Sequence, residues 1–233
     1  MRKKILLIDV DDTLLDFTSG EKTAIKLTLD RFGLPTDEKT INEYHEFNEK
    51  LWKAYERGEI TKPELVIERF SLLLDTLSVS NVSPQEMNAE YFDNLKLQCE
   101  YRIGAKEFLD KIKDYYRIVL ITNGTTMIQN SRLRLSGLID KVEKVFISEQ
   151  LGTKKPELKF FRIVENGVDD FRKEDCVLCG DSLTSDVLGG INYGIPTVWF
   201  NPDDKPTDEK IKPSYTVRDF DELYELLVNG SFA

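Results

Sequence analysis

The sequence has few of the residues on which many catalytic sites depend. Its 233 residues include one histidine, His45, and three cysteines, and 42 acidic residues outnumber 32 basic ones. A single histidine makes catalytic triads and zinc sites that need imidazole groups hard to build. The net charge of −10 argues against a surface evolved to bind nucleic acid polymers. Any chemistry is therefore expected to depend on carboxylates.

Long hydrophobic runs are also lacking at the start of the chain. A short basic segment leads into an apolar run over residues 5–8, which Asp9 ends after four residues. Such a run is too short for a signal peptide or a membrane span. The odd number of cysteines differs from secreted proteins of this size, which usually pair their thiols. These features predict a cytoplasmic protein without membrane partners.

Two of the cysteines, Cys176 and Cys179, have the spacing of a metal-binding or redox pair. They lie inside an apolar run that is typical of a buried strand. Residues three apart on a strand point to opposite faces, so these thiols cannot share a metal. We expect both to be small buried side chains.

Short β-rich runs alternate with stretches of helical length over much of the chain. This alternation is typical of βαβ units, and it predicts an α/β fold with a parallel sheet. The runs at 118–121 and 177–179 are nearly uninterrupted in hydrophobicity, as expected for strands that helices cover on both faces. The predicted strands are residues 5–9, 117–122, 144–148, 176–181 and 197–201.

A different pattern occupies residues 18–97, where four helices and no convincing strand are predicted. Gly33 and Gly58 mark the ends of the first two helices, and Thr61 and Ser83 are suited to cap the starts of the next two. This segment is expected to be a helical domain inserted after the first strand. The predicted domains are thus an α/β core of residues 1–17 and 98–233 and a four-helix insert of residues 18–97.

The most informative segment is the end of the first predicted strand, where Asp9 is followed by Asp11. In an extended chain, residues i and i+2 point the same way, so both carboxyl groups can face one reacting group. One can attack phosphorus while the other donates a proton to the departing alkoxide. The alternative is an acidic turn in which Thr13 acts as a local cap.

Three further segments place polar groups directly after predicted strands. Thr122, Asn123 and Gly124 can form a small anion cradle, although Asn-Gly is also an ordinary turn. A lysine of the pair at 154–155 can bind a phosphate, unless both are merely solvated. The carboxylates of Asp181 and Asp186 suit a cation such as Mg²⁺. Because ligands bind at the carboxyl edge of an open α/β sheet, the four segments together predict one site.

In order and spacing, these segments resemble the haloacid dehalogenase-like (HAD) hydrolase superfamily, over essentially the whole chain. The first motif is matched by residues 9–13, the second by Thr122, the third by Lys155, and the fourth by Asp181 with Asp186. The resemblance implies a Rossmann-like core with a helical cap. It also implies an enzyme, a phosphatase that hydrolyses phosphomonoesters.

The family resemblance assigns a role to each candidate. It implies Asp9 as the nucleophile that forms an aspartyl-phosphate, and Asp11 as general acid and then base. It implies Mg²⁺ bound by Asp9, the main-chain carbonyl of Asp11 and Asp181, with Asp186 in support. Asp12 stands where many members have glycine. The phosphate is expected to bind to Thr122, the amides of Asn123 and Gly124, and Lys155, which is preferred over Lys154 because it precedes proline.

The same motifs distinguish subclasses of the superfamily. True dehalogenases of the superfamily lack the second aspartate, so Asp11 favours phosphoryl chemistry. Residues 51–61, 121–124, 147–149 and 189–192 are similar to the house-cleaning pyrimidine 5′-nucleotidases. That likeness suggests nucleoside 5′-monophosphates, including nonstandard pyrimidine ones, as small-molecule substrates. Residues expected to stack on the base or form a lid are Trp52, Tyr55 and Phe17, with packing of the cap as the alternative for the first two.

The same residues are compatible with other functions on this fold. A phosphosugar or phosphoglycolate phosphatase, or a phosphomutase, would use the same pair of aspartates. A non-catalytic binding protein is disfavoured, because a degenerate member should have lost at least one of Asp9, Asp11, Lys155 and Asp181. The sequence does not select the physiological substrate, because fold alone does not set function.

Overall fold

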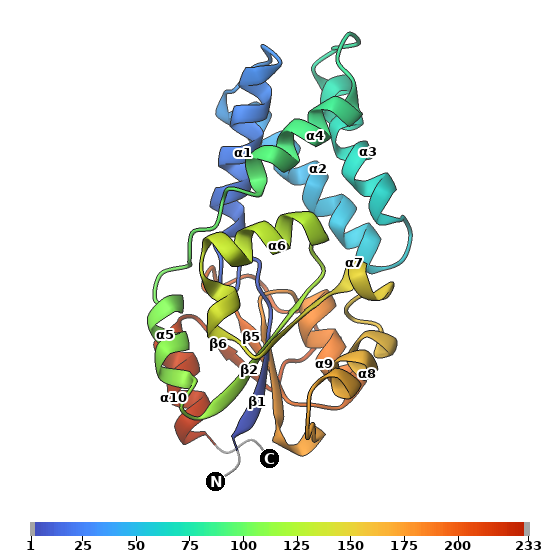
Figure 1. Ribbon diagram of the computed structural model, residues 1–233. Coiled ribbons are helices and arrows are strands. Elements are labelled where there is room, and N and C mark those ends of the chain that lie inside the picture. The colour runs from blue at the N-terminus through green and yellow to red at the C-terminus, as the bar shows by residue number, and fades with distance from the viewer. Residues whose placement is uncertain (1–2, 231–233) are drawn as a thin grey trace. The chain divides into compact units, whose positions relative to one another are not determined.

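The computed structural model describes residues 3–230, which belong to two compact units (Figure 1). The sheet unit consists of residues 1–16 and 100–233, of which 3–16 and 100–230 are described. The helical unit consists of residues 17–99. Each unit has its own buried core, and each is described in turn.

The described part of the sheet unit is built on six parallel strands in the order β3-β2-β1-β4-β5-β6. This confirms the predicted α/β, Rossmann-like class. Five strands coincide with predicted runs, whereas the three-residue edge strand β6 was missed because it has no apolar run. The strands are β1 (Lys4–Ile8), β2 (Tyr116–Thr122), β3 (Lys144–Ile147), β4 (Cys176–Gly180), β5 (Thr197–Phe200) and β6 (Tyr215–Val217).

Helices cover both faces of this sheet, as the uninterrupted apolar strands predicted. Phe108 and Phe220 pack on one face, together with Cys179. Phe160 packs on the other face with Cys176, so the two thiols do lie on opposite sides. The helices are α5 (Ala105–Ile112), α6 (Thr126–Leu135), α7 (Ser148–Leu151), α8 (Leu158–Gly167), α9 (Leu188–Tyr193) and α10 (Phe220–Asn229), with short helical turns at Leu138–Lys141, Lys173–Asp175 and Leu183–Val187.

The helical unit contains four helices within its fully described residues 17–99. Thr61 and Glu64 form the predicted capping box, and Ser83 accepts a hydrogen bond from the amide of Glu86. Gly33 and Gly58 adopt left-handed φ angles of 67° and 77°, which end the first two helices. The helices are α1 (Phe17–Arg31), α2 (Glu38–Glu56), α3 (Lys62–Thr76) and α4 (Pro84–Leu95).

A polar network lies inside the helical unit. Arg69 is buried, stacks 4.6 Å from the ring centre of Tyr91, and donates to Asn48 at 3.1 Å. Asn48 in turn donates to the buried carboxylate of Glu21. His45 is exposed, and its Nδ1 hydrogen-bonds to Glu21 at 2.6 Å, which links α2 to α1.

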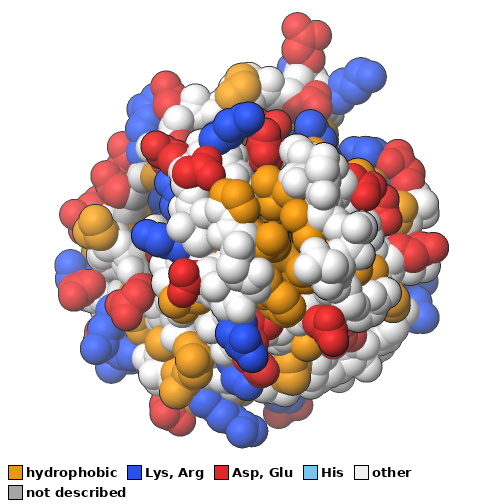
Figure 2. All heavy atoms as spheres, turned by 90° about the horizontal axis from the view of Figure 1, so that it is seen from above, with side chains coloured by type: hydrophobic (Ala, Val, Ile, Leu, Met, Phe, Trp, Pro, Cys, Tyr) orange, Lys and Arg blue, Asp and Glu red, His pale blue; other side chains and the backbone are white. Residues whose placement is uncertain are grey.

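The face of the molecule shown in Figure 2 agrees with the charge composition. On the face shown in Figure 2, acidic and basic side chains are interspersed around a patch of hydrophobic ones. This differs from the continuous basic surface of nucleic-acid-binding proteins. None of the helices in residues 3–230 is long and apolar enough to cross a membrane.

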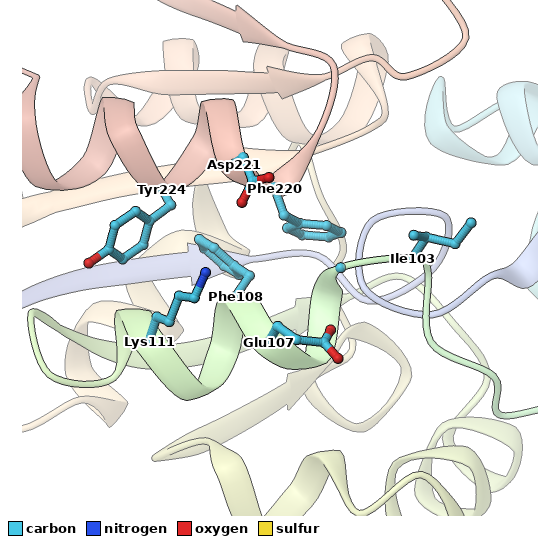
Figure 3. A pocket seen from close by; sticks show the side chains of 8 residues that line it. Ile103, Glu107, Phe108, Lys111, Phe220, Asp221 and Tyr224 are labelled. Carbon is cyan, nitrogen blue, oxygen red and sulfur yellow. The ribbon is translucent and has the colours of Figure 1, made fainter.

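A cavity of about 400 Å³ opens between α5 and α10 in the sheet unit (Figure 3). Phe108 and Phe220 form its apolar floor, and the side chains of Lys111, Asp221 and Tyr224 surround it. None of the candidate site residues contributes to its lining. The cavity is therefore separate from the polar groups that follow the strands.

Candidate active site

The first, second and fourth motif segments meet the sheet at the carboxyl ends of neighbouring strands. Asp9 directly follows β1, Thr122 is the last residue of β2, and Asp181 directly follows β4. Since β1 pairs in parallel with both β2 and β4, the three segments emerge at the same edge. Lys155 reaches this edge from the loop between α7 and α8. The structure thus brings together side chains that lie far apart in the sequence.

Three carboxyl groups form the centre of the site. Oxygens of Asp9, Asp181 and Asp186 lie within 4.8 Å of one another. Lys155 is only 1% exposed, and its Nζ donates to Oδ1 of Asp9 at 2.5 Å and to Oδ1 of Asp186 at 2.7 Å. One ammonium group therefore serves two of the three carboxylates.

This crowding changes the protonation of the site. Burial raises the pKa of Asp9 to about 8; Lys155 lowers this pKa, while Asp186 and Asp11 raise it. Burial and the charge of Asp9 likewise raise the pKa of Asp181 well above its usual value. Burial lowers the pKa of Lys155, but Asp186 and Asp9 outweigh burial and raise it above its usual value. Without a further cation, the buried carboxyl groups of Asp9 and Asp181 therefore hold their protons more tightly than free ones do.

Such a cluster suits a hard divalent cation. Carboxylate oxygens are the ligands that Mg²⁺ prefers, and the buried Asp9 and Asp186 supply them beside Asp181. A cation would also offset the repulsion that raises the pKa values of Asp9 and Asp181. The donor set therefore fits the predicted metal, and a role for the main-chain carbonyl of Asp11 stays a prediction.

Neighbouring side chains hold Asp181 in place. The backbone amide of Asp181 donates to Oγ1 of Thr13 at 3.1 Å, and the indole Nε1 of Trp199 donates to its carbonyl at 2.8 Å. Gly180 makes room for the third carboxylate, because a Cβ there would lie 2.3 Å from Oδ2 of Asp186. The glycine before Asp181 is thus required by packing.

The predicted phosphate-binding segment lies beside the acidic cluster. Oγ1 of Thr122 accepts a hydrogen bond from the amide of Gly124 at 3.0 Å. The side chain of Asn123 makes a reciprocal pair with the main chain of Lys155, with both distances 3.0 Å. Asn123 therefore fixes the loop that delivers Lys155 to the carboxylates. Phosphate binding by these groups remains a prediction.

Asp12, where many superfamily members have glycine, adopts a φ of 55°. This left-handed conformation favours glycine and is tolerated by aspartate better than by most residues. Its carboxylate lies 3.5 Å from the guanidinium of Arg102. The backbone geometry at Asp12 is thus one that glycine adopts without strain.

Two residues that sequence reasoning missed bind the carboxyl group of Asp11. Arg132 donates to its Oδ1, and Gln129 donates to its Oδ2 at 2.7 Å. Both lie on α6 at helical spacing i and i+3, and both are 1% exposed. The available sequence signal was a pair of polar residues on the inward face of a helix that follows a motif.

Trp52 and Tyr55, the predicted base-stacking residues, belong to the helical unit. Both are half-buried, and their rings meet edge to face at 5.7 Å. The Nζ of Lys62 lies 5.7 Å from the ring centre of Trp52 and 5.5 Å from that of Tyr55. Trp52, Tyr55 and Lys62 therefore form a small cluster at the junction between α2 and α3. Contact of the two rings with substrate remains a prediction.

Comparison with known proteins defines the family. Residues 3–194 match the family model of the haloacid dehalogenase-like hydrolases, so the chain belongs to this family and is a hydrolase. It is 37% identical to the pyrimidine 5′-nucleotidase PynA of Streptococcus pneumoniae, over 96% of this chain and 94% of PynA. It is 31% identical to the pyrimidine 5′-nucleotidase YjjG of Escherichia coli, over 95% of this chain and 96% of YjjG.

A solved structure resembles the whole chain. It is that of the HAD-hydrolase YfnB from Bacillus subtilis bound to magnesium, in a form that reveals interdomain movement in YfnB. The TM-score is 0.92 and the sequence identity 34%, with 98% of this chain and all of YfnB covered. The fold and the family predicted from the motifs are both confirmed.

Proposed function

We propose that this protein is a Mg²⁺-dependent phosphomonoesterase that acts on nucleoside 5′-monophosphates through an aspartyl-phosphate on Asp9. The observation that carries the proposal is the cluster of Asp9, Asp181 and Asp186 at one sheet edge, where Asp9 and Asp186 also bind the ammonium of Lys155. Asp11 follows the nucleophile at the spacing that gives it access to the same reacting group.

The proposed reaction has two steps with opposite proton transfers. In the first, a carboxylate oxygen of Asp9 attacks phosphorus, the ester P–O bond breaks, and Asp11 gives its proton to the leaving oxygen. In the second, Asp11 takes a proton from water, the water oxygen attacks phosphorus, and the bond to Asp9 breaks. Inorganic phosphate is released and both aspartates return to their starting states.

The surrounding groups are proposed to bind the phosphoryl oxygens. Thr122 and the amides of Asn123 and Gly124 would donate to them, and Lys155 would pair with their charge while holding Asp9 ready for attack. Asp9, the main-chain carbonyl of Asp11 and Asp181, with Asp186 in support, would hold Mg²⁺, which would supply positive charge to offset the negative charge of the phosphate.

A nucleotide substrate is supported by two observations. Full-length relatives at 37% and 31% identity are pyrimidine 5′-nucleotidases. The helical unit carries the Trp52 and Tyr55 rings, whose faces suit a nucleobase. In this proposal residues 17–99 act as a cap that excludes water during the reaction.

A panel of phosphate esters tests the proposal. Phosphate release would be measured with Mg²⁺ for nucleoside 5′-monophosphates, sugar phosphates, phosphoglycolate and p-nitrophenyl phosphate. We expect the highest kcat/KM for a pyrimidine nucleotide. Equal or better turnover of sugar phosphates would reject the nucleotide claim, as would transfer of the phosphoryl group without release of free phosphate.

The covalent mechanism has its own test. Asp9→Asn should abolish turnover of every ester while the far-ultraviolet circular dichroism spectrum stays unchanged, because the amide cannot attack phosphorus. Retained activity in this variant, or activity of the wild type in excess EDTA, would contradict the nucleophile or the metal respectively.

A further inference from the structure

The carboxyl group of Asp11 is held by one helix of the sheet unit. Arg132 and Gln129 of α6 each bind one of its two oxygens. The side chain of Asp11 is 26% exposed, whereas both donors are 1% exposed. Two buried side chains therefore hold the partly exposed carboxyl group of Asp11 in place.

The same glutamine links Asp11 to the predicted phosphate site. The Nε2 of Gln129 donates to Oγ1 of Thr122 at 2.7 Å as well as to Asp11. Its Oε1 accepts from Arg132 at 3.3 Å, which fixes the orientation of the amide. The positions of the proton-transfer group and of the phosphate anchor are thus coupled through one side chain.

The absence of a side chain at Gly124 leaves space for the side chain of Gln129. A Cβ at Gly124 would lie 2.5 Å from Nε2 and 2.7 Å from Cδ of Gln129. A Cβ at this position would therefore require the side chain of Gln129 to move. The glycine of the Thr-Asn-Gly segment therefore has a second task besides turning the chain.

Stability alone does not explain buried Gln129 and Arg132. Burying a guanidinium and an amide is costly unless both are fully paired, and apolar side chains of similar volume are often as stable. The same helix already buries Ile128 and Leu133. The polar side chains of Gln129 and Arg132, at the two inward positions that reach Asp11, thus indicate a functional role at the site.

We infer that Gln129 and Arg132 are positioning residues that aim the carboxyl group of Asp11 at the leaving-group oxygen. The inference rests on the proposed phosphomonoesterase function. Neither residue is assigned a contact with substrate; both act through the placement of Asp11. Proton transfer requires heavy-atom distances near 3 Å, and a misplacement of about 1 Å can cost about 100-fold in rate.

The leaving group distinguishes positioning from general support of the fold. An alkoxide leaves poorly without a proton, so alkyl esters such as nucleotides and sugar phosphates depend on Asp11. The p-nitrophenolate anion leaves readily without one. Misplacement of the Asp11 carboxyl group should therefore lower kcat/KM for alkyl esters much more than for p-nitrophenyl phosphate.

The experiment compares Gln129→Met and Arg132→Met with Asp11→Asn and the wild type. The substrates are p-nitrophenyl phosphate and whichever alkyl ester of the panel the wild type hydrolyses best. We expect the ratio of aryl to alkyl kcat/KM to rise about 10- to 100-fold in both variants, toward that of Asp11→Asn. Arg134→Met is the matched control, because Arg134 is exposed on the same helix, and its ratio should stay at the wild-type value.

Proportional loss on both esters, or no change in the ratio, would overturn the inference. Arg132→Lys keeps the charge but not the fork of donors, and a ratio between those of wild type and Arg132→Met would support it. If Arg132→Met fails to fold, the ratios of Gln129→Met and Arg132→Lys decide the question. A wild type that hydrolyses no ester would reject the proposed function instead, so the two failures are distinguishable.

Discussion

The Nζ of Lys155 lies 2.5 Å from Oδ1 of Asp9, although 146 positions separate the two residues. The same ammonium is 2.7 Å from Asp186, and both carboxylates are buried. Lys155 is thus the cation that permits two acidic side chains to be buried at one edge of the sheet. Its removal should affect stability and catalysis together.

Replacing Lys155 by Met leaves the buried side chains of Asp9 and Asp186 without their ammonium partner. Breaking a buried ion pair from one side costs about 3 kcal/mol or more. We therefore expect a large loss of unfolding free energy in EDTA, measured by urea denaturation, and loss of turnover with Mg²⁺. The neighbouring Lys154→Met is the matched control and should retain turnover. Equal effects of the two substitutions would contradict the assignment of Lys155.

The raised pKa of Asp9 predicts an unusual pH dependence for the metal-free protein. Its pKa is about 8 when folded, against 3.8 for an unperturbed aspartate, so the folded state binds the proton more tightly. This contribution to stability is complete below about pH 4 and is lost as the pH rises through about 8. Asp9→Asn should remove it.

Urea denaturation in EDTA at pH 5 and pH 8 measures this contribution. Between these values, wild type should lose at least about 1 kcal/mol more than Asp9→Asn, since one pKa unit corresponds to about 1.4 kcal/mol. Added Mg²⁺ should stabilise wild type more at pH 8 than at pH 5, because a cation binds the deprotonated carboxylates. Parallel pH curves for the two proteins would show that Asp9 titrates normally.

The strands and the site edge were predictable because their signals are local. Residues 5–8 and 118–121 are apolar runs followed at once by polar groups, and parallel strands bring such ends together. Gln129 and Arg132 were not predictable in this way, because their partner Asp11 is more than a hundred residues away. Only the fold shows that the inward face of α6 meets the first motif.

A single methyl group at Gly180 should disrupt the acidic cluster. Its Cβ would lie 2.3 Å from Cγ and Oδ2 of Asp186, so that carboxylate must move. We expect Gly180→Ala to weaken Mg²⁺ binding at least about tenfold, as measured by calorimetry, since loss of support around metal ligands typically costs 10- to 100-fold in affinity.

Gly152→Ala provides the control for this substitution. Gly152 has a φ of 60°, and a Cβ there would meet nothing within 4 Å. The variant should lose about 1 kcal/mol of stability through backbone strain but bind Mg²⁺ normally. Normal Mg²⁺ binding by Gly180→Ala would mean that Asp186 does not support the metal.

The aromatic cluster of the helical unit gives a test of the proposed substrate. If Trp52 stacks on the base, Trp52→Ala should raise KM for a pyrimidine nucleotide about tenfold, because stacking on a base contributes about 1–3 kcal/mol. Ribose 5-phosphate has no base, so its KM should stay within about twofold. If Trp52 instead only packs against Tyr55, its replacement should affect both esters alike.

Thermal unfolding and a second variant separate these roles. Phe70→Leu removes volume from the buried centre of the helical unit and should lower Tm without changing the ratio of the two KM values. If Trp52→Ala behaves in the same way, its ring serves packing alone, and discrimination of the base must lie elsewhere. A selective rise in KM for the nucleotide, with a Tm near that of wild type, would assign the ring to the substrate, because packing affects both esters alike.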